Sequence, residues 1–329
     1  MTNNDQPLSE PTAGRQGIVF KKSLGQYFLD VEGETVTCSI SNRLRKYLQY
    51  PTAPENSGTR RGVQKVKKIR MVDPVAIGDQ VLYEPTDPGC GLIKEVLPRR
   101  NQLVRKAADA GMFQAIAANV DQILIIMAVA QPEPRWHLLD RCLAAAESQQ
   151  LPAAVVLTKA DLVKERKVKP MMKIYQDIGY PVVLTSVEDG RRIDQFADSI
   201  AGKLSVLVGM SGVGKSSLLN AVQPDLGLRV NQISGFSGKG RHTTSHLEMF
   251  PLDRGGYLVD TPGIKTFGLV GMPKRRGALA VLFPEMLPYI GQCRFRTDCA
   301  HDKEPDCAIK EAVAQGAIAH RRYQSYLRL

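Results

Sequence analysis

Short stretches of alternating apolar and polar residues fill the first third of the chain. Val36, Cys38 and Ile40 alternate with threonine and serine, which predicts a strand with one buried face. Residues 81–83 and 92–93 are further apolar runs, each next to a turn rich in glycine, aspartate or proline. Roughly five such strands in about ninety residues favour a small β-barrel of the OB type, a common platform for nucleic acids.

We expect this barrel to occupy residues 15–108 and to follow a disordered polar tail over residues 1–14. A long interruption at residues 47–72 carries arginines and lysines with few acidic residues to balance them. A loop of this length inside a compact domain is usually functional or disordered, and its basic density fits contact with a phosphate backbone. A solvated charged loop is the alternative interpretation.

From Val120 the pattern changes to apolar strands that alternate with amphipathic helices. Residues 121–127 form the continuous apolar run of a fully buried strand, and residues 136–149 have the apolar spacing of a helix. The alternation continues at 153–157, 182–185, 193–204, 247–251 and 256–259. Such a pattern predicts a parallel sheet covered on both faces. We assign this α/β domain to residues 109–272, and a C-terminal domain of different composition to residues 273–329.

A glycine-rich segment joins one of these strands to a helix. Residues 209–216 read G-x-x-x-x-G-K-S, and an apolar run precedes them. A phosphate-binding loop requires this strand–loop–helix context, because backbone N–H groups must point inward at the positive end of a helix. Lys215 can reach the β- and γ-phosphates, and the Ser216 hydroxyl can bind Mg²⁺. The phosphate-binding candidates are Gly209, Ser211, Gly212, Val213, Gly214, Lys215, Ser216 and Ser217.

A second motif, T-K-A-D at residues 158–161, ends a predicted buried strand. The Asp161 carboxylate can accept the ring N–H and amino hydrogens of guanine, a pattern that adenine lacks, and the stem of Lys159 can cover the base. Ligands bind at this carboxyl edge of an α/β sheet. Ser186, after the next strand, can place backbone N–H groups near the guanine O6. Ordinary loop residues are the alternative interpretation at each position.

A third motif, D-T-P-G at residues 260–263, follows another apolar run. Asp260 would hold Mg²⁺ through a water molecule, and the Gly263 N–H would donate to the γ-phosphate. The polar, glycine-rich segment 238–245 lies between the phosphate loop and this motif, and we expect it to be mobile. A threonine there can complete the Mg²⁺ shell only when a γ-phosphate is present, as in a switch loop.

The order of these motifs differs from that of ordinary GTPases, in which the guanine-reading motif comes last. Here residues 158–161 precede the phosphate loop. Neighbouring strands of a sheet need not be neighbours in sequence, so a circularly permuted chain can form the same site. The segment after Gly263 then becomes a domain end, and a downstream domain can act directly on the switch.

Three cysteines and one histidine are grouped within fifteen residues of the C-terminal domain: Cys293, Cys299, His301 and Cys307. Three thiolates and one imidazole suit a closed tetrahedral Zn²⁺ site, which is structural rather than catalytic. We therefore expect one structural zinc ion. Free cysteines on a basic surface are the alternative interpretation.

The charge of the chain indicates a polyanionic partner. The formal net charge of +11 favours nucleic acid, because the longest apolar run, 123–130, is too short to span a membrane. The first residues also lack the apolar core of a signal peptide. We expect a cytoplasmic protein without a membrane partner, in which clustered cysteines bind metal rather than form disulfides.

Taken together, these motifs resemble those of the ribosome small-subunit-dependent GTPases, circularly permuted enzymes that act late in assembly of the bacterial 30S subunit. The resemblance extends over residues 15–329 and includes G-R-H-T-T at 240–244, D-T-P-G at 260–263, F-P-E at 283–285 and R-Y-Q-S-Y at 322–326. It implies that the OB and zinc domains hold 16S rRNA and that the small subunit stimulates GTP hydrolysis.

The same resemblance gives roles to the switch loop. It implies that Thr244, with Thr243 as the alternative, binds Mg²⁺. Ile264 follows Gly263 where many GTPases have a water-orienting glutamine, and the resemblance places the candidate for that role at His242. A mobile histidine without this role is the alternative. Thr158 stands where asparagine is common, so we expect looser GTP binding and a weaker tie to the phosphate loop.

We therefore expect three domains: an N-terminal OB-type β-barrel, a central α/β circularly permuted P-loop GTPase domain, and a mainly helical C-terminal zinc-binding domain. The expected protein is a monomeric GTP hydrolase with Mg²⁺ as cofactor, and its partners are GTP, GDP, the 30S subunit and 16S rRNA. One rival is a small-molecule P-loop kinase, which would usually lack the guanine-reading motif. The other is a non-hydrolysing RNA-binding assembly factor whose nucleotide only sets its shape.

Overall fold

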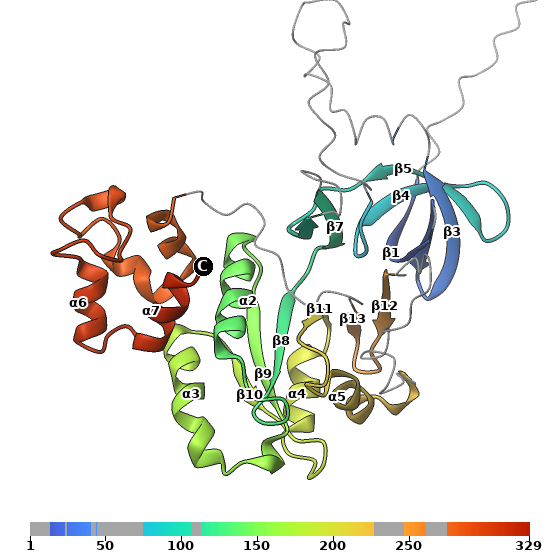
Figure 1. The fold of residues 1–329 in the computed structure, drawn as a ribbon. Coiled ribbons are helices and arrows are strands. Elements are labelled where there is room, and N and C mark those ends of the chain that lie inside the picture. The colour runs from blue at the N-terminus through green and yellow to red at the C-terminus, as the bar shows by residue number, and fades with distance from the viewer. Residues whose placement is uncertain are drawn as a thin grey trace, which may run out of the picture.

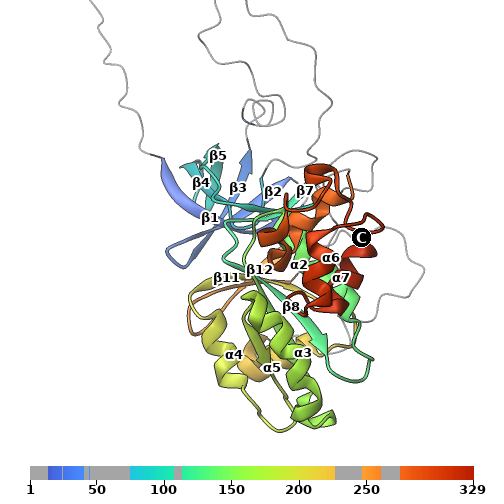
Figure 2. The same cartoon turned by 90° about the vertical axis from the view of Figure 1, so that its left-hand side faces the viewer.

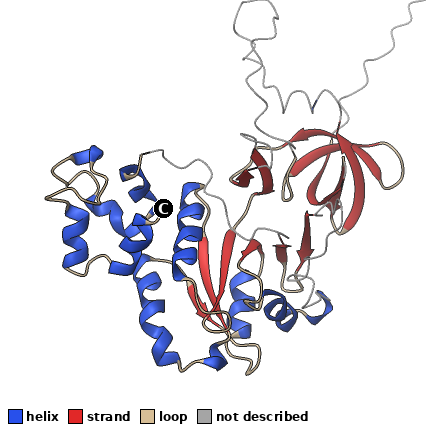
Figure 3. Cartoon of the chain, in the orientation of Figure 1, coloured by secondary structure: helices blue, strands red, loops and turns tan. Residues whose placement is uncertain are grey.

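A computed structural model of the chain describes residues 14–23, 25–40, 44, 75–106, 113–226, 247–260 and 275–329 (Figure 1). A β-barrel, a central α/β part and a helical C-terminal part follow one another along the chain (Figure 3). The predicted fold class is confirmed. The basic insert at 47–72 and residues 1–13 of the predicted tail lie outside the described residues.

Five strands form the barrel: β1 (Arg15–Ser23), β2 (Gln26–Val31), β3 (Glu34–Ile40), β4 (Gln80–Pro85) and β5 (Cys90–Val96). Their order is β1-β2-β3-β5-β4, and pairing between β1 and β4 closes the ring. β3 and β5 are parallel, whereas the other pairs are antiparallel, which is a Greek-key arrangement of the OB type. The predicted alternation is confirmed, since Val36, Cys38 and Ile40 are buried in the barrel core.

The central part contains a sheet in the order β10-β9-β8-β11-β13-β12. Its strands are β8 (Gln122–Ala128), β9 (Ala153–Thr158), β10 (Val182–Leu184), β11 (Lys203–Val208), β12 (Leu247–Pro251) and β13 (Gly256–Asp260). All pairings are parallel except that between β12 and β13. The segments that precede the phosphate loop, β8 to β10, therefore form one half of the sheet, and β13 and β12 form the other half.

Helices cover both faces of this sheet, as the alternating pattern predicted (Figures 1 and 2). The helices are α2 (Trp136–Ser148), α3 (Glu165–Ile178), α4 (Ile193–Ile200) and α5 (Lys215–Val222). Leu143 of α2 and Tyr175 of α3 pack on one face, in a core that includes Ile125. Phe196 of α4 and Leu218 of α5 belong to a second core on the opposite face. Short 3₁₀ turns η1 (Ala160–Leu162) and η2 (Pro224–Leu226) follow β9 and α5.

The barrel and the central sheet are continuous. β1 of the barrel pairs antiparallel with β12, with Lys21 opposite Glu248 and Lys22 opposite Leu247. On its other side, β12 pairs with β13, where Glu248 lies opposite Asp260. Eleven of the described strands thus form one sheet that runs from β10 of the central part into the barrel.

A separate two-stranded hairpin connects the barrel to the central part. Its strands, β6 (Gln102–Lys106) and β7 (Phe113–Ala118), are antiparallel. The expected domain boundary between residues 108 and 109 lies within this hairpin. The Asn101 side chain bonds to both backbone groups of Val120, at 2.8 Å each, which fastens the hairpin to the start of β8.

The C-terminal part consists of short helices around its own apolar core. They are η3 (Gly277–Leu282), η4 (Pro284–Tyr289), η5 (Arg296–Asp298), α6 (Ala308–Ala314) and α7 (His320–Leu327). Phe283 and Tyr326 meet edge-to-face in this core, with ring centroids 5.6 Å apart. Ala144 of α2 belongs to the same cluster, so the helical part packs directly on the central part. Among the described residues, none of the helices has the length and apolarity that a membrane span requires.

Candidate nucleotide and metal sites

The phosphate loop, residues 209–214, runs from the end of β11 to the start of α5. Gly212 and Gly214 have φ angles of +78° and +89°, which glycine adopts without strain. A Cβ atom on Gly209 would lie 2.5 Å from the carbonyl oxygen of Ile126 in β8, so this position also requires glycine. The sequence GxxxxGK therefore folds into a tight turn at the N-terminus of a helix, where backbone N–H groups favour anions.

Lys215 folds back over the phosphate loop. Its Nζ atom donates to the carbonyl oxygens of Gly209 and Met210, at 2.8 and 2.7 Å. Ser216, the next residue, is buried at the start of α5. The cationic amine is thus held at the mouth of the loop, where a phosphate chain would exchange these carbonyl contacts for its own oxygens.

The guanine-reading candidates lie at the end of β9 and in η1. Lys159 has a φ of +60°, and its Nζ atom donates to the carbonyl oxygen of Gln131 in the loop after β8. The Ser186 hydroxyl donates to Asp161 Oδ1 at 2.6 Å. Ser186 is itself buried, so its hydroxyl fixes the direction of the Asp161 carboxylate.

The guanine-reading loop and the phosphate loop are in direct contact. The Thr158 hydroxyl donates to the carbonyl oxygen of Val213 at 2.5 Å. A Cβ atom on Gly214 would lie 3.8 Å from Thr158 Oγ1 and 4.0 Å from Lys159 Cε. Two loops that are fifty residues apart in the chain therefore line the same edge of the sheet, on either side of β8. We expected Thr158 to weaken the connection to the phosphate loop. The connection is present, and a hydroxyl makes it instead of an amide.

The remaining predicted nucleotide residues are only partly placed. Asp260 ends β13, and its neighbour Val259 pairs with Val206 of the strand that leads into the phosphate loop. The backbone of Asp260 therefore lies at the same sheet edge as the phosphate loop. Gly263, His242 and Thr244 lie outside the described residues, so their predicted roles stay predictions.

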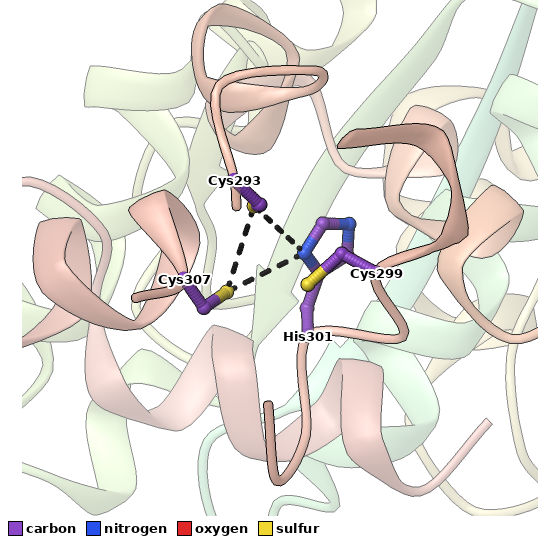
Figure 4. Close-up of side chains that lie close together, drawn as sticks. All are labelled: Cys293, Cys299, His301 and Cys307. Atoms are coloured by element: carbon purple, nitrogen blue, oxygen red, sulfur yellow. Dashed lines mark hydrogen bonds between the residues drawn. The ribbon is translucent and has the colours of Figure 1, made fainter. Parts of the chain in front are cut away.

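The four predicted metal ligands come together in the C-terminal part (Figure 4). One donor atom of each of Cys293, Cys299, His301 and Cys307 lies within 4.8 Å of the others, and all four residues are buried. His301 Nδ1 is 3.4 Å from Cys293 Sγ and 3.5 Å from Cys307 Sγ, and the two sulfur atoms are 3.7 Å apart. Tetrahedral zinc, with Zn–S of about 2.3 Å and Zn–N of about 2.0 Å, requires S–S and S–N separations of about 3.8 and 3.6 Å. The cluster fits a zinc ion.

Burial determines the ionisation of these ligands when no cation is bound. Burial raises the pKa of the Cys299 thiol to about 12 and also raises that of Cys307. Burial lowers the pKa of His301, which favours the neutral imidazole. Without a cation the thiols keep their protons, whereas a metal ion displaces them and forms thiolates, so metal binding here releases protons.

The loop that carries His301 is held by its neighbours. Glu304 accepts the backbone N–H groups of Ala300 and Asp302, both at 2.9 Å. Backbone N–H groups, including that of Glu304 itself, lower the pKa of this carboxyl to about 2. A Cβ atom on Gly277 would lie 2.1 Å from the carbonyl oxygen of Cys299, so η3 approaches the loop as closely as glycine permits. The ligand geometry is therefore pre-organised by the chain.

Comparison with known proteins agrees with this arrangement. The sequence model of the RsgA GTPase family matches residues 96–270, more than half of the chain. The chain belongs to the RsgA GTPase family. A curated relative, the small ribosomal subunit biogenesis GTPase RsgA of Moorella thermoacetica, is 36% identical over 313 residues, which cover 95% of each chain. The resemblance stated from the motifs is therefore confirmed.

Two solved structures show the same architecture over nearly the whole chain. YjeQ from Thermotoga maritima has 33% sequence identity and a TM-score of 0.72, with 95% of this chain and 96% of that chain covered. YloQ, described as a circularly permuted GTPase, has 27% identity and a TM-score of 0.68, with 96% and 94% covered. The RsgA family fold thus includes the barrel and the helical part as well as the GTPase domain.

Sequence reasoning missed one buried polar site of this RsgA-family chain. Asp140 of α2 and Arg322 of α7 are fully buried and form an ion pair at 2.8 Å. The signal for Asp140 was present, because it shares the apolar face of its helix with Trp136, Leu139 and Leu143 at helical spacing. A lone aspartate on such a face requires a buried partner. The sequence does not say where that partner is.

Proposed function

We propose that this protein hydrolyses GTP when activated by the small ribosomal subunit, and acts late in 30S maturation through nucleotide-dependent binding to 16S rRNA. Membership of the RsgA GTPase family supports GTP hydrolysis, and the printed name of the Moorella relative supports the ribosomal role. The observation that carries the proposal is the contact between Thr158 and Val213, because it brings a guanine-reading loop and a phosphate loop to one site.

The phosphate half of the proposed site stabilises the triphosphate and Mg²⁺. Lys215 leaves its two carbonyl partners for the β- and γ-phosphates, and the Ser216 hydroxyl binds Mg²⁺. Asp260, at the end of β13, holds Mg²⁺ through water, and Thr244 completes the shell when the γ-phosphate is present. His242 assists the attack of water on the γ-phosphate, and the Gly263 N–H donates to its oxygens.

The guanine half of the proposed site selects the base. Asp161 accepts the N1–H and 2-amino hydrogens, one on each carboxylate oxygen, while the Ser186 hydroxyl, 2.6 Å from Oδ1, orients the carboxylate. The stem of Lys159 covers the base plane. Adenine offers an acceptor where guanine offers a donor, so it would face the carboxylate unfavourably, and a buried polar mismatch of this kind discriminates strongly.

The flanking domains supply the proposed contacts to 16S rRNA. The net charge of +11 supports binding to a polyanion. In this proposal the barrel domain extends over residues 15–108, the GTPase domain over 109–272 and the zinc domain over 273–329. The protein acts as a cytoplasmic monomer, with one zinc ion in the Cys₃His site and Mg²⁺ bound with GTP or GDP.

Phosphate release tests the proposal. The rate is measured with GTP and with ATP, each with and without purified small ribosomal subunits. We expect slow release from GTP alone, marked stimulation by small subunits, and no comparable rate with ATP. Equal use of ATP, or no stimulation by subunits, contradicts the proposal. A phosphorylated small-molecule product indicates the kinase alternative instead.

A His242→Ala variant separates hydrolysis from binding. We expect it to bind GTP with wild-type affinity and to lose subunit-stimulated hydrolysis, because Lys215 and Asp161 remain. The variant is then supplied to cells that lack the wild-type protein. Normal 30S maturation by a variant that does not hydrolyse GTP supports the non-hydrolysing assembly factor and contradicts an essential role of hydrolysis.

A further inference from the structure

Helix α7 contacts two different parts of the protein through two different faces. Arg322 and Ser325, three residues apart, contact Asp140 of the GTPase domain. Tyr323 and Tyr326, also three residues apart, contact the loop that carries the metal ligand His301. With 3.6 residues per turn, the two faces are about 100° apart on the helix. A shift of α7 therefore moves both sets of contacts together.

The contact with the GTPase domain is centred on the Asp140 carboxylate. Arg322 Nη1 donates to Oδ1 at 2.8 Å, the Ser325 hydroxyl donates to Oδ2 at 2.5 Å, and the Tyr175 hydroxyl of α3 donates to Oδ1 at 2.9 Å. Arg322 also pairs with Glu285 of η4, with Nε and Oε1 2.6 Å apart. Asp140 and Arg322 are both 0% exposed. The three hydrogen bonds to Asp140 are thus buried, whereas that between Arg322 and Glu285 is partly buried.

Two aromatic rings complete the surroundings of Arg322. Its guanidinium carbon lies 4.7 Å from the centre of the Phe283 ring and 5.9 Å from that of Tyr175. Burial alone lowers the pKa of Arg322, but Asp140 and Glu285 outweigh it, so the net effect raises the pKa and the side chain stays charged. Because a buried charge without its partner is strongly unfavourable, Arg322 and Asp140 require each other.

The second face of α7 fixes backbone atoms of the metal loop. The Tyr323 hydroxyl donates to the carbonyl oxygen of His301 at 2.8 Å. The Tyr326 hydroxyl donates to the carbonyl oxygen of Ala300, also at 2.8 Å. His301 has a φ of +56°, an uncommon conformation for a residue other than glycine, and these contacts help to hold it. The position of α7 and the shape of the metal loop therefore depend on each other.

On the GTPase side, Tyr175 joins the contact to α3, the helix whose N-terminal end follows the predicted guanine-reading loop. Tyr175 lies in α3, and α3 begins three residues after η1, the turn that contains Asp161. Tyr175 is fully buried and stacks on Trp136 of α2, with ring centroids 6.1 Å apart and planes at 16°. A contiguous set of hydrogen bonds and packed rings thus runs from the metal loop through α7 and Asp140 to α3.

We propose that zinc binding and guanine-nucleotide binding are reciprocally coupled in this protein, and that Asp140 is the positioning residue that transmits the coupling through α7. The proposal rests on the proposed function for the guanine site. Each ligand orders one end of the same set of contacts, so the presence of either lowers the cost of ordering the other end. By linkage, the factor by which zinc raises nucleotide affinity equals the factor by which nucleotide raises zinc affinity.

The test measures the equilibrium partition of zinc between the full chain and a chromophoric chelator of known affinity, with and without saturating GDP. We expect GDP to raise the zinc affinity at least about 5-fold, the lower end of typical coupling between sites. Ser325→Ala removes one of the hydrogen bonds that Asp140 accepts, and in this variant we expect the effect of GDP to shrink. In Asp140→Asn, which removes the charge, we expect it to disappear. Ser325→Ala keeps the test informative if Asp140→Asn does not fold.

The matched control is Glu147→Gln on the same helix. Glu147 Oε1 accepts the Tyr180 hydroxyl at 2.8 Å, a hydrogen bond between α2 and the segment after α3 that includes no residue of α7. We expect this variant to keep the wild-type effect of GDP on zinc affinity. Equal zinc affinities with and without GDP in the wild type overturn the proposal, as does an unchanged GDP effect in both Ser325→Ala and Asp140→Asn. Failure of GDP to bind the zinc-loaded wild type is separate, because it contradicts the proposed function itself.

Discussion

The Thr158 hydroxyl donates to the carbonyl oxygen of Val213 at 2.5 Å, which joins the guanine-reading loop to the phosphate loop. A threonine hydroxyl has one hydrogen, and it is used in this contact. An asparagine amide has two hydrogens and a longer reach. Thr158 therefore keeps the tie between the loops but leaves no donor for the purine.

Substitution of Thr158 separates these two roles. Thr158→Val keeps the shape but leaves the buried Val213 carbonyl without its donor, so we expect a loss of about 1–3 kcal/mol in the free energy of unfolding and weaker binding of GDP. Thr158→Asn supplies a hydrogen-bond donor to the purine. We therefore expect the affinity for GDP to rise about 5-fold, which is the effect of one hydrogen bond. Denaturant unfolding and nucleotide titration measure the two effects. Unchanged stability in Thr158→Val contradicts the role given to the tie.

Asp161 is predicted to set the identity of the base. Asp161→Asn replaces one acceptor by a donor, which opposes the 2-amino group of guanine but matches the 2-oxygen of xanthine. We expect GTP affinity to fall at least about 100-fold and XTP to bind in its place, because a buried mismatch is costly. Competition titration with GTP, XTP and ATP measures the change. Loss of GTP binding without a gain of XTP binding would show that the variant disrupts the loop instead of changing its specificity.

Gly209 is predicted to be indispensable to the phosphate loop. In Gly209→Ala, the new Cβ atom would lie 2.5 Å from the carbonyl oxygen of Ile126, a backbone atom of a central strand. We expect the variant to lose about 1–3 kcal/mol of stability and most of its nucleotide affinity, because the loop must move to relieve the contact. Gly202→Ala is the control, since its Cβ atom would meet nothing within 4 Å. Its φ of +68° makes it strained but leaves the phosphate loop intact.

The Tyr257 hydroxyl donates to Asp30 Oδ2 at 2.6 Å, which links β13 of the GTPase domain to β2 of the barrel. The other oxygen of Asp30 accepts the Gly33 N–H at 2.9 Å. Tyr257→Phe removes only the link between the domains. We expect a loss of about 1 kcal/mol in the free energy of unfolding, as for a typical partly exposed hydrogen bond. Asp30→Ala tests the same link from the barrel side but also removes the contact with Gly33, and no loss of stability in Tyr257→Phe contradicts the link.

The same link has a pH signature. The hydrogen bond to Asp30, together with partial burial, raises the pKa of Tyr257 to about 12. Because the folded-state pKa is raised, the stabilisation is complete below the ordinary tyrosine pKa near 10 and is lost as the pH rises through about 12. Ultraviolet titration compares the wild type with Tyr257→Phe, and we expect the variant to lack one phenolate transition near pH 12. If the transition that the variant lacks lies near pH 10, Asp30 does not hold the hydroxyl.

Local patterns predicted the elements and the ligand sets well. The Cys₃His cluster was predictable because its four ligands lie within one short segment, and the structure brings them to tetrahedral spacing. The phosphate loop was predictable because Gly209, Gly212 and Gly214 meet steric requirements that act over a few residues. The alternation of Val36, Cys38 and Ile40 likewise fixed which face of β3 is buried.

Contacts between distant segments were not predictable from the same patterns. Asp140 signals that it needs a partner, but nothing near it in sequence specifies Arg322, which lies 182 residues later. The pairing of Lys22 with Leu247 depends on how the barrel and the GTPase domain pack together. Neither β1 nor β12 has a sequence pattern that indicates this pairing. The hydroxyl tie of Thr158 depends on how closely the two loops approach, which the residue type alone does not give.

The pairing between β1 and β12 has a consequence for any shortened form of the chain. Without the barrel, the backbone N–H and C=O groups of β12 that face Lys21 and Lys22 would lose their partners. An unpaired strand of this kind is a template for association with other chains. Removal of the barrel would therefore expose an edge strand of the GTPase domain, and the shortened chain would self-associate through it.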